Sequence, residues 1–367
     1  MKILFLAPDL FKGTGGIQTY TADLCRVLAQ GNECTVISLN DRGYTGELPF
    51  RFIAAGSLWS LRKMVFIAKA FLTAIVHKPE CLWCGHVHFA SLCRAIQFIT
   101  GIPFVAVTYG IESWKLSRFQ RTALSFARNI ISISSFTKEK VLRQLAAYDP
   151  ARVTVIPCTV NTELFKPVVP PEHLKRTLEI QPQDKVILTV ARLSSQERYK
   201  GVDAVIRALA LVQTALPHVR YIVVGDGDDR MRLRRMIREY ALEKVVSLVG
   251  FVPAESLVDY YNLCDCFAMP SSGEGFGIAF LEALACGKPV LAGNSDASSE
   301  ALLDGKLGLM VDPGDHRQIA QSLLSLLAPD GRGRFFDPVS LRQEIIGHFG
   351  AERFRRRIAD FLRESSP

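Results

Sequence analysis

A loop rich in glycine and serine, PSSGEGFG at residues 270–277, runs directly into the apolar stretch IAFLEALACGKP at residues 278–289. The glycine and the proline that close this stretch are typical of a helix end, so the sequence predicts a short helix over residues 277–286. The helix is apolar on every side, which predicts burial, yet Glu282 lies in its middle. Because a buried carboxylate without partners is strongly unfavourable, Glu282 must meet a polar group.

The start of this helix combines a predicted anion site with two carboxylates. The first N–H groups of a helix have no partner inside the helix, and the glycines before it let a ligand approach the backbone. Glu274 lies just before the helix, and Glu282 lies within it. One ligand suits this arrangement if it carries a phosphate for the N–H groups and hydroxyl-rich groups for the carboxylates.

Strands alternate with helices in two series along the chain, which is the pattern of doubly wound α/β domains. The first series opens with a strand at residues 2–7, and the second runs from a strand at 185–191 to one at 289–292, with helices after it. A chain of 367 residues is too long for one typical domain. We therefore expect an α/β fold with two doubly wound, Rossmann-like domains that face one cleft. The predicted domains are 1–164 and 165–350, and a basic C-terminal helix within 351–367 crosses back to the first domain.

A glycine loop follows the first predicted strand, at the edge where doubly wound domains bind ligands. Its glycines, Gly13, Gly15 and Gly16, depart from the GxGxxG spacing of dinucleotide-binding domains, so a dinucleotide is not favoured. A loop that lets a phosphate or a sugar approach the first helix fits the pattern better. The alternative is a tight turn that binds nothing.

Two cations and a glycine turn follow strands of the second series. Arg192 comes directly after the strand at 185–191, and Lys200 ends the short polar loop that follows. At the ligand edge of a sheet, two such cations can hold a diphosphate. The turn Gly225-Asp226-Gly227 follows the next strand and permits a close backbone approach. Each cation alone is equally consistent with a solvated surface charge.

The net charge of +8 belongs to the first half of the chain. Residues 1–165 hold 18 Lys and Arg against 10 Asp and Glu, whereas the remaining residues hold 26 of each. This asymmetry predicts an anionic surface or acceptor for the first half, and a membrane or a nucleic acid could supply it. Because no nucleic-acid recognition motif accompanies the charge, the membrane is the better candidate.

Two basic, strongly apolar segments also favour a membrane surface. Residues 57–79 contain four Lys or Arg and no acid, and residues 113–128 add Trp114, Phe119 and further cations. Basic amphipathic helices of this kind lie on anionic lipid. The alternative is a pair of ordinary packed helices with solvated basic side chains.

The cysteines and the hydropathy pattern set the expected location. Nine cysteines without a framework spacing predict free thiols in a reducing cytoplasm. Cys81, Cys84, His86 and His88 have a zinc-like spacing, but they lie where a strand runs into a loop and have no second ligand pair, so a core strand is favoured. No apolar run is long enough to span a bilayer. We expect a cytoplasmic protein, peripheral on the inner face of the membrane if its basic half binds lipid.

Six motifs, in order along the chain, resemble a known family. They are Gly13-Thr-Gly-Gly16, Ala191-Arg-Leu, Lys200-Gly201, Val224-Gly-Asp-Gly227, Gly250-Phe-Val and Glu274-Gly-Phe-Gly-Ile-Ala-Phe-Leu-Glu282. Together they are similar to the retaining glycosyltransferases of family 4 (GT4), which have the GT-B fold, and the resemblance covers nearly the whole chain. It implies transfer of a sugar from a nucleoside-diphosphate sugar to a hydroxyl of a lipid-linked or saccharide acceptor, in cell-surface polysaccharide or glycolipid synthesis. It implies no required metal or other cofactor.

The same resemblance implies roles for single residues. Arg192 and Lys200 hold the donor diphosphate with the N–H groups that begin the helix at 277–286. Glu282 binds the ribose, Glu274 binds the transferred sugar, and Arg192, Lys200 and Glu274 are the catalytic residues. The first domain binds the acceptor, and the second binds the donor. The implied donor site consists of Gly15, Gly16, Tyr109, Arg192, Lys200, Gly225, Gly250, Phe251, Glu274, Phe276, Gly277, Ile278 and Glu282.

The chain departs from the family pattern at two places. Tyr109-Gly110 stands where many relatives have His-Gly, and a phenol can hydrogen-bond but is not a cation near pH 7. Thr159-Val160-Asn161 stands where Gly-Val-Asp is usual, which removes a carboxylate. Neither departure touches the implied diphosphate site. The rival activities are nucleotide-sugar binding without turnover and a GT-B epimerase or phosphorylase.

Overall fold

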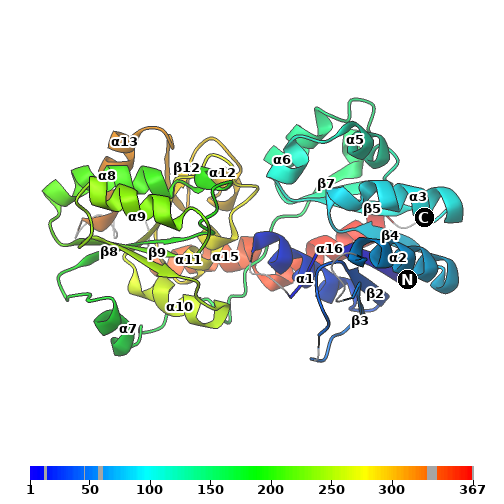
Figure 1. Cartoon of the computed structure of the whole chain (residues 1–367), viewed down its shortest axis with the longest axis horizontal. Coiled ribbons are helices and arrows are strands. Elements are labelled where there is room, and N and C mark those ends of the chain that lie inside the picture. The colour runs from blue at the N-terminus through cyan, green and yellow to red at the C-terminus, as the bar shows by residue number, and fades with distance from the viewer. Residues whose placement is uncertain (12–14, 45, 57–60, 329–336, 366–367) are drawn as a thin grey trace. The chain divides into compact units, whose positions relative to one another are not determined.

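The computed structural model of the chain divides into two units (Figure 1). Unit 1 comprises Met1–Cys158 and Phe354–Pro367, and unit 2 comprises Thr159–Arg353. The two breaks lie a few residues from the borders predicted after residues 164 and 350. The structure describes residues 1–11, 15–44, 46–56, 61–328 and 337–365.

A sheet of seven parallel strands forms the centre of unit 1, in the order β3-β2-β1-β4-β5-β6-β7. Successive residues of a strand point to opposite faces of the sheet. Leu82 of β4 therefore joins the core on one face, while Trp83 packs on the other face against Phe361. Both faces are covered, which explains why these strands are apolar throughout. The strands are β1 (Lys2–Ala7), β2 (Glu33–Ser38), β3 (Arg51–Ala54), β4 (Cys81–Cys84), β5 (Phe104–Thr108), β6 (Asn129–Ser132) and β7 (Val153–Val155).

Helices cover both faces of this sheet. On one face, Phe66 of α2, Cys93 of α3 and Leu124 of α5 belong to a single apolar core. On the other face, the ring of Tyr20 in α1 contacts the ring of Phe354 in α16, which attaches the C-terminal helix to unit 1. The helices are α1 (Gly16–Leu28), α2 (Arg62–His77), η1 (Val87–Phe89), α3 (Ala90–Thr100), α4 (Ile111–Trp114), α5 (Arg118–Leu124), α6 (Ser135–Leu142), η2 (Pro150–Arg152) and α16 (Ala351–Ser365).

Unit 2 contains a second parallel sheet, of six strands in the order β10-β9-β8-β11-β12-β13. The expectation of helices alone after the strand at 289–292 was wrong, because residues 308–311 form the edge strand β13, and β3 in unit 1 was likewise not predicted. Both are four-residue edge strands whose pairing with one neighbour, rather than their own periodicity, fixes them. The strands are β8 (Lys185–Val190), β9 (Val219–Val224), β10 (Val246–Gly250), β11 (Cys266–Met269), β12 (Val290–Gly293) and β13 (Gly308–Val311).

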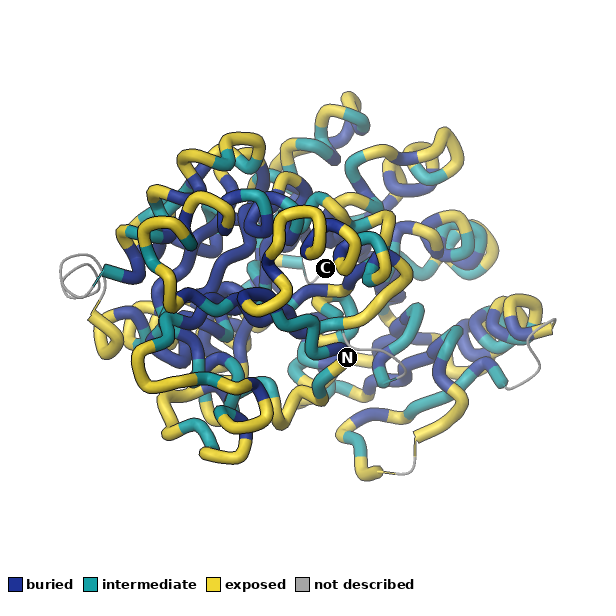
Figure 2. The backbone as a smooth tube through the Cα atoms, turned by 60° about the vertical axis from the view of Figure 1, so that its left-hand side comes forward, coloured by how far each residue is buried: buried dark blue, intermediate teal, exposed yellow. Residues whose placement is uncertain are grey.

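Helices cover both faces of the second sheet as well, and Figure 2 shows exposed positions along the outer sides of helices and in loops, with buried positions inside each unit.

None of the described helices is long and apolar enough to cross a membrane. No group of three or more His, Cys, Asp or Glu among the described residues is arranged to hold a metal ion. The helices of unit 2 are α7 (Glu172–Thr177), η3 (Arg198–Lys200), α8 (Val202–Ala215), α9 (Arg230–Glu239), α10 (Ala254–Leu263), α11 (Ile278–Ala285), α12 (Ser298–Ala301), α13 (His316–Leu327) and α15 (Pro338–Phe349).

The strand order of each sheet contains one switch point. In unit 1 the chain adds β2 and β3 on one side of β1 and then continues with β4 on the other side; in unit 2 it adds β9 and β10 beside β8 and then continues with β11 on the other side. The loops that follow the two strands beside the switch point run in opposite directions. Doubly wound sheets bind their ligands in the space between two such loops. In unit 2 these two loops contain Arg192 and residues 270–277.

Candidate functional site

The loop after β11 is held tightly against the loop after β8. Gly201 has a positive φ of 79°, and a Cβ placed on it would lie 2.3 Å from the carbonyl oxygen of Pro270, so no other residue fits there without a backbone shift. The N–H of Ser272 donates to the carbonyl of Tyr199 at 2.9 Å. These contacts fix η3 beside the glycine-rich loop.

Lys200 and Glu274 form an ion pair where the two loops meet. The ammonium of Lys200, the last residue of η3, donates to Oε1 of Glu274, and the exposed fractions of the two side chains are 16% and 11%. The structure thus unites two of the three predicted catalytic side chains. Removal of either partner would leave the other as an uncompensated, largely buried charge, which is strongly unfavourable.

Asp296, which was not predicted as a site residue, organises the loop that carries Glu274. Its Oδ2 accepts the N–H of Glu274 at 2.6 Å and the hydroxyl of Ser271 at 2.7 Å, and its Oδ1 accepts the N–H of Ser298 at 2.9 Å. Burial raises the pKa of this carboxyl, and the hydrogen bonds oppose that shift. An aspartate two residues before a helical serine is typical of a local turn, so no sequence pattern indicates that Asp296 reaches back to the glycine-rich loop.

The N-terminus of α11 is open at the same edge. Gly277 precedes the helix with a φ of 95°, in the left-handed region that favours glycine, and no side chain of the described residues caps the helix. The first N–H groups, including that of Ile278, are therefore available to an anion. Phe276 was predicted to bind the donor, but its ring is buried and packs against Phe349.

Glu282 has a protein partner, which was not foreseen. The hydroxyl of Tyr261 in α10 donates to Oε2 of Glu282 at 2.6 Å. Burial raises the pKa of Glu282 to about 7, although the hydrogen bond from Tyr261 acts in the opposite direction. The polar group that the apolar helix required is thus supplied in part by the chain itself, and Oε1 makes no hydrogen bond to any described residue.

Arg192 lies at the same edge but is more open to solvent. Its guanidinium pairs with Oε1 of Glu197 at 2.5 Å, and its side chain is 61% exposed. The other oxygen of Glu197 is buried and has no hydrogen-bond partner among the described residues. Arg192 contacts neither Lys200 nor Glu274, so the structure places the two predicted diphosphate ligands at one sheet edge without joining them.

A second ionic cluster anchors η3. Two nitrogens of Arg198 donate to Oδ1 of Asp229 at 2.9 and 3.1 Å, and Arg232 bridges Asp229 to Asp203. The hydrogen bond from Arg232 is the main cause that lowers the pKa of Asp229. This cluster fixes the segment that ends in Lys200, and the sequence analysis did not identify it.

The loops after β9 and β10 complete the edge. Gly225 has a φ of 136°, and a Cβ on it would lie 1.8 Å from the carbonyl oxygen of Ala191, so glycine is required for this close approach. The N–H of Gly225 donates to the carbonyl of Gly250 at 2.8 Å. Phe251, next in the chain, is exposed. Gly225, Gly250 and Phe251 thus lie beside the loop that contains Arg192.

The predicted site residues of unit 1 have a different setting. Gly15 and Gly16 begin α1, whereas Gly13 lies outside the described residues. Tyr109 is buried: its hydroxyl donates to the carbonyl of Gly85 at 3.0 Å and lies 2.8 Å from Oγ1 of Thr21. Burial raises the pKa of this phenol well above its usual value. The hydroxyl is therefore engaged by protein groups in the interior of unit 1.

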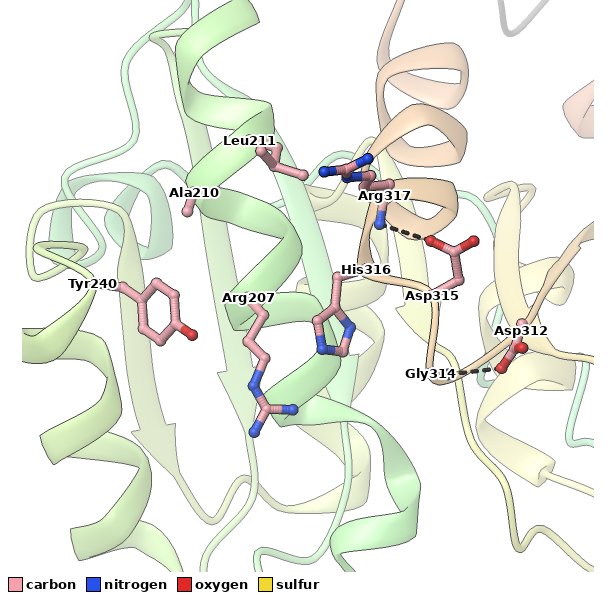
Figure 3. A pocket seen from close by; sticks show the side chains of 9 residues that line it. All are labelled: Arg207, Ala210, Leu211, Tyr240, Asp312, Gly314, Asp315, His316 and Arg317. Carbon is pink, nitrogen blue, oxygen red and sulfur yellow. Dashed lines mark hydrogen bonds between the residues drawn. The ribbon is translucent and has the colours of Figure 1, made fainter.

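A separate groove of unit 2 lies between α8 and α13 (Figure 3). It has a volume of about 760 Å³ and contains none of the predicted site residues. Its two carboxylates are engaged locally: Asp315 caps α13 through the N–H of Arg317, and Asp312 accepts the N–H of Gly314. The candidate site is therefore defined by the strand-end loops and not by this groove.

The chain contains two doubly wound parallel domains, which is the architecture of GT-B glycosyltransferases. Two family models agree with this class: "Glycosyl transferases group 1" matches residues 172–334, and "Glycosyltransferase Family 4" matches residues 14–164. The chain belongs to glycosyltransferase family 4, which confirms both the fold and the family that its motifs predicted.

Relatives in this family match over most of their length. A GDP-mannose-dependent alpha-(1-6)-phosphatidylinositol monomannoside mannosyltransferase of Mycolicibacterium smegmatis is 28% identical over 90% of each chain. A D-inositol 3-phosphate glycosyltransferase of Acidothermus cellulolyticus is 30% identical over 90% of this chain and 80% of its own. Among solved structures, Anabaena Alr3699/HepE in complex with UDP-glucose superposes with a TM-score of 0.81 over 99% of this chain and 100% of its own, at 22% identity.

Proposed function

We propose that this glycosyltransferase moves a sugar from a nucleoside-diphosphate sugar to an acceptor hydroxyl, with retention of configuration and without a metal ion. The observation that carries the proposal is the Lys200–Glu274 pair at the switch point of unit 2, beside the uncapped N-terminus of α11. The pair offers a cation to the leaving group and a carboxylate to sugar hydroxyls. Family membership and the nucleotide-sugar complexes of structural neighbours support it.

The donor diphosphate would lie between Lys200 and the first N–H groups of α11, those of Gly277 and Ile278. A helix N-terminus favours anions because its N–H groups are free and its dipole is positive there. Arg192 would add a second cation once its exposed side chain turns from Glu197 to the phosphates. In unit 1, Gly15 and Gly16 leave the start of α1 open to a close approach.

The sugar and the nucleoside would engage the two carboxylates. Glu274 would accept hydrogen bonds from hydroxyls of the transferred sugar, and Glu282 would accept from the ribose through Oε1, since Oε2 already holds Tyr261. The backbone at Gly250 and Phe251 would face the base. Asp296 would act as a positioning residue, because it holds the backbone N–H of Glu274.

Electrostatic stabilisation would supply most of the catalysis. As the bond from the sugar to the phosphate oxygen breaks, negative charge grows on the leaving diphosphate, where Lys200, Arg192 and the helix N–H groups lower its energy. These groups replace the role that a metal has in other transferases. A phosphate oxygen of the leaving group would take the proton of the acceptor hydroxyl on the same face of the sugar, which retains the configuration.

The acceptor would be a lipid-linked or saccharide molecule of cell-surface polysaccharide or glycolipid synthesis. The names of two relatives support this class: one acts on a phosphatidylinositol mannoside, and the other on inositol 3-phosphate. The excess of positive charge in the N-terminal half suits an acceptor with phosphate groups.

A donor screen tests the proposal. Thermal shifts with UDP, GDP and ADP, then with the corresponding sugars, identify the nucleotide, and release of nucleoside diphosphate measures turnover with and without EDTA. We expect one nucleotide to raise the melting temperature, and its sugar to be turned over equally well in EDTA, with an α-linked product in proton NMR. Donor binding without release of nucleoside diphosphate, under any acceptor tried, would indicate a binding protein instead.

A further inference from the structure

Helices α2, α3 and α5 of unit 1 contain no acidic residue. Between residues 61 and 138 the sequence has ten Lys and Arg but only two acids, Glu80 and Glu112. Both carboxylates are engaged by backbone: Glu80 accepts the N–H of Lys2, and Glu112 accepts the N–H groups of Tyr109 and Gly110. The surface formed by these helices is therefore strongly positive.

Helix α2 has an apolar side that no described residue covers. Phe66 and Ala70 face the core, as expected for a helix packed on a sheet. Met64, Leu72 and Val76 lie on the opposite side, at helical spacing, and each is more than 60% exposed. A surface helix normally has polar residues on its outer side. The apolar residues on the outer side of α2 therefore indicate that this surface contacts an apolar partner.

The neighbouring helices extend this apolar surface. α3 packs against both α2 and α5, and the three helices share one layer of unit 1 (Figure 1). Phe98 at the end of α3 is 79% exposed, and Phe119 of α5 is 80% exposed. The guanidinium of Arg94 lies over the ring of Phe126, 3.7 Å from its centroid, and 5.8 Å from that of Phe98. Exposed rings interleaved with cations suit the interface between lipid headgroups and acyl chains.

We propose that the outward side of α2, α3 and α5 docks on an anionic lipid bilayer. This lipid face consists of Met64, Leu72, Val76, Phe98, Ile99 and Phe119, with exposed cations such as Lys63, Arg118 and Arg121 beside them. The apolar side chains enter the headgroup region, and the cations attract anionic lipids. Two properties of the lipid face favour an anionic bilayer. The face has no acidic residue that could pair with a basic protein, and its broad aliphatic area does not match the surface of a nucleic acid.

The sequence predicted part of this face and missed part of it. Of the predicted cations, Arg62 is buried and Lys69 donates to the carbonyl of Ala54, so neither is free at the surface. Trp114 donates to Thr137 and is partly buried, and residues 57–60 lie outside the described residues. The exposed residues of α3, which no basic segment announced, join the two predicted segments into one surface.

Vesicle co-sedimentation of the full chain tests the proposal. The vesicles are phosphatidylcholine alone and equal parts of phosphatidylcholine and phosphatidylglycerol, at low and high salt. The variant Leu72→Ser/Phe98→Ser/Phe119→Ser removes apolar contacts, and Val169→Ser/Met231→Ser/Val339→Ser is its control at exposed apolar positions of unit 2. We expect binding to the anionic vesicles only, weaker in salt, reduced at least about tenfold in the first variant and unchanged in the control.

A charge variant separates the two contributions. Arg118→Gln/Arg121→Gln should weaken anionic-vesicle binding about tenfold at low salt, while Arg234→Gln/Arg235→Gln, exposed in unit 2, should not. The proposal fails if the chain stays in the supernatant with anionic vesicles at low salt, or if both triple variants bind alike. It also fails if light scattering shows a dimer that the Leu72→Ser/Phe98→Ser/Phe119→Ser variant dissociates, because the face would then bind a second copy. Vesicle binding needs no sugar donor, so this outcome is independent of the transferase assay.

Discussion

Lys200 pairs with Glu274 at the switch point of unit 2, whereas the predicted site residue of unit 1, Tyr109, is a neutral phenol directed into the core. The two units have the same doubly wound topology and the same edge at which to bind a ligand. In unit 2 that edge holds cation–carboxylate pairs, whereas in unit 1 the carboxylates of Asp41 and Glu112 at the edge accept backbone N–H groups. Exposed cations of unit 1 lie on its helices α2 and α5. The same fold thus places ion pairs at the strand edge in one unit and exposed cations on a helix surface in the other.

The physical reason is the cost of burying charge. At the edge of unit 2, Lys200 has a carboxylate within contact, so its charge can be held largely away from water, whereas Arg192 is paired but exposed. The ion pairs of unit 1, such as Arg143–Glu139, lie on its surface and remain solvated, and Arg94 rests on the ring of Phe126. The comparison predicts that substitutions of charged residues in unit 2 affect turnover. Substitution of the neutral Tyr109 in unit 1 should affect only stability.

The largest effect is expected for Lys200→Ala. It removes the cation nearest the proposed leaving group and leaves Glu274 with an unpaired charge, so kcat/KM should fall by a hundredfold or more, about 3 kcal/mol of the barrier. The control is Lys244→Ala, an exposed lysine of the same unit. Steady-state release of nucleoside diphosphate measures both. Equal turnover in Lys200→Ala and the wild type would contradict the proposed role of the ion pair.

Asp296→Asn should have the next largest effect. The substitution weakens three hydrogen bonds to a carboxylate, and each such bond contributes about 1.5 to 3 kcal/mol. We expect a loss of about 2 kcal/mol in stability and about tenfold weaker nucleotide binding, since the Glu274 loop loosens. Asp312→Asn, exposed and bonded to the N–H of Gly314, is the matched control. Calorimetric titration that finds unchanged affinity in Asp296→Asn would remove Asp296 from the positioning role.

Glu282 gives unit 2 a pH-dependent stability. Its folded-state pKa of about 7 lies above the usual 4.5, so the folded state holds this proton more tightly, and stability is lost as pH rises from about 4.5 to 7. Glu282→Gln removes this titration while keeping an acceptor for Tyr261. Relative to the wild type, the variant should be unchanged at pH 4 and more stable by about 3 kcal/mol at pH 8. Urea unfolding at both pH values measures the difference, and a difference that does not vary with pH would show that Glu282 is ionised normally.

The smallest effect is expected for Tyr109→Phe in unit 1. The change removes the hydroxyl that bonds Gly85 and Thr21, and the loss of a neutral buried hydrogen bond costs about 1 kcal/mol. Turnover should change by less than about threefold, because the hydroxyl does not face a ligand. Thermal unfolding and the donor assay measure the two quantities. A large loss of turnover at unchanged stability would place the phenol in the site and remove the contrast between the units.

The sequence by itself determined the two α/β series, the fold and the family, because buried parallel strands are continuous apolar runs and ligand loops carry glycines at fixed spacing. It also predicted Glu274 and Lys200 as site residues, since each follows a strand at the ligand edge. The basic character of unit 1 was equally visible as a count of charges.

Only the tertiary structure decided which side chains meet. Lys200 and Glu274 are 74 residues apart and pair because β8 and β11 are neighbours, a pairing that no local pattern encodes. Tyr261 meets Glu282 and Asp296 meets Glu274 through other contacts between elements far apart in the sequence. Phe276, which was predicted to bind the donor, has its ring packed against Phe349. The long buried strands are encoded by their own residues, whereas the edge strands β3 and β13 and the candidate site depend on contacts between elements that folding brings together.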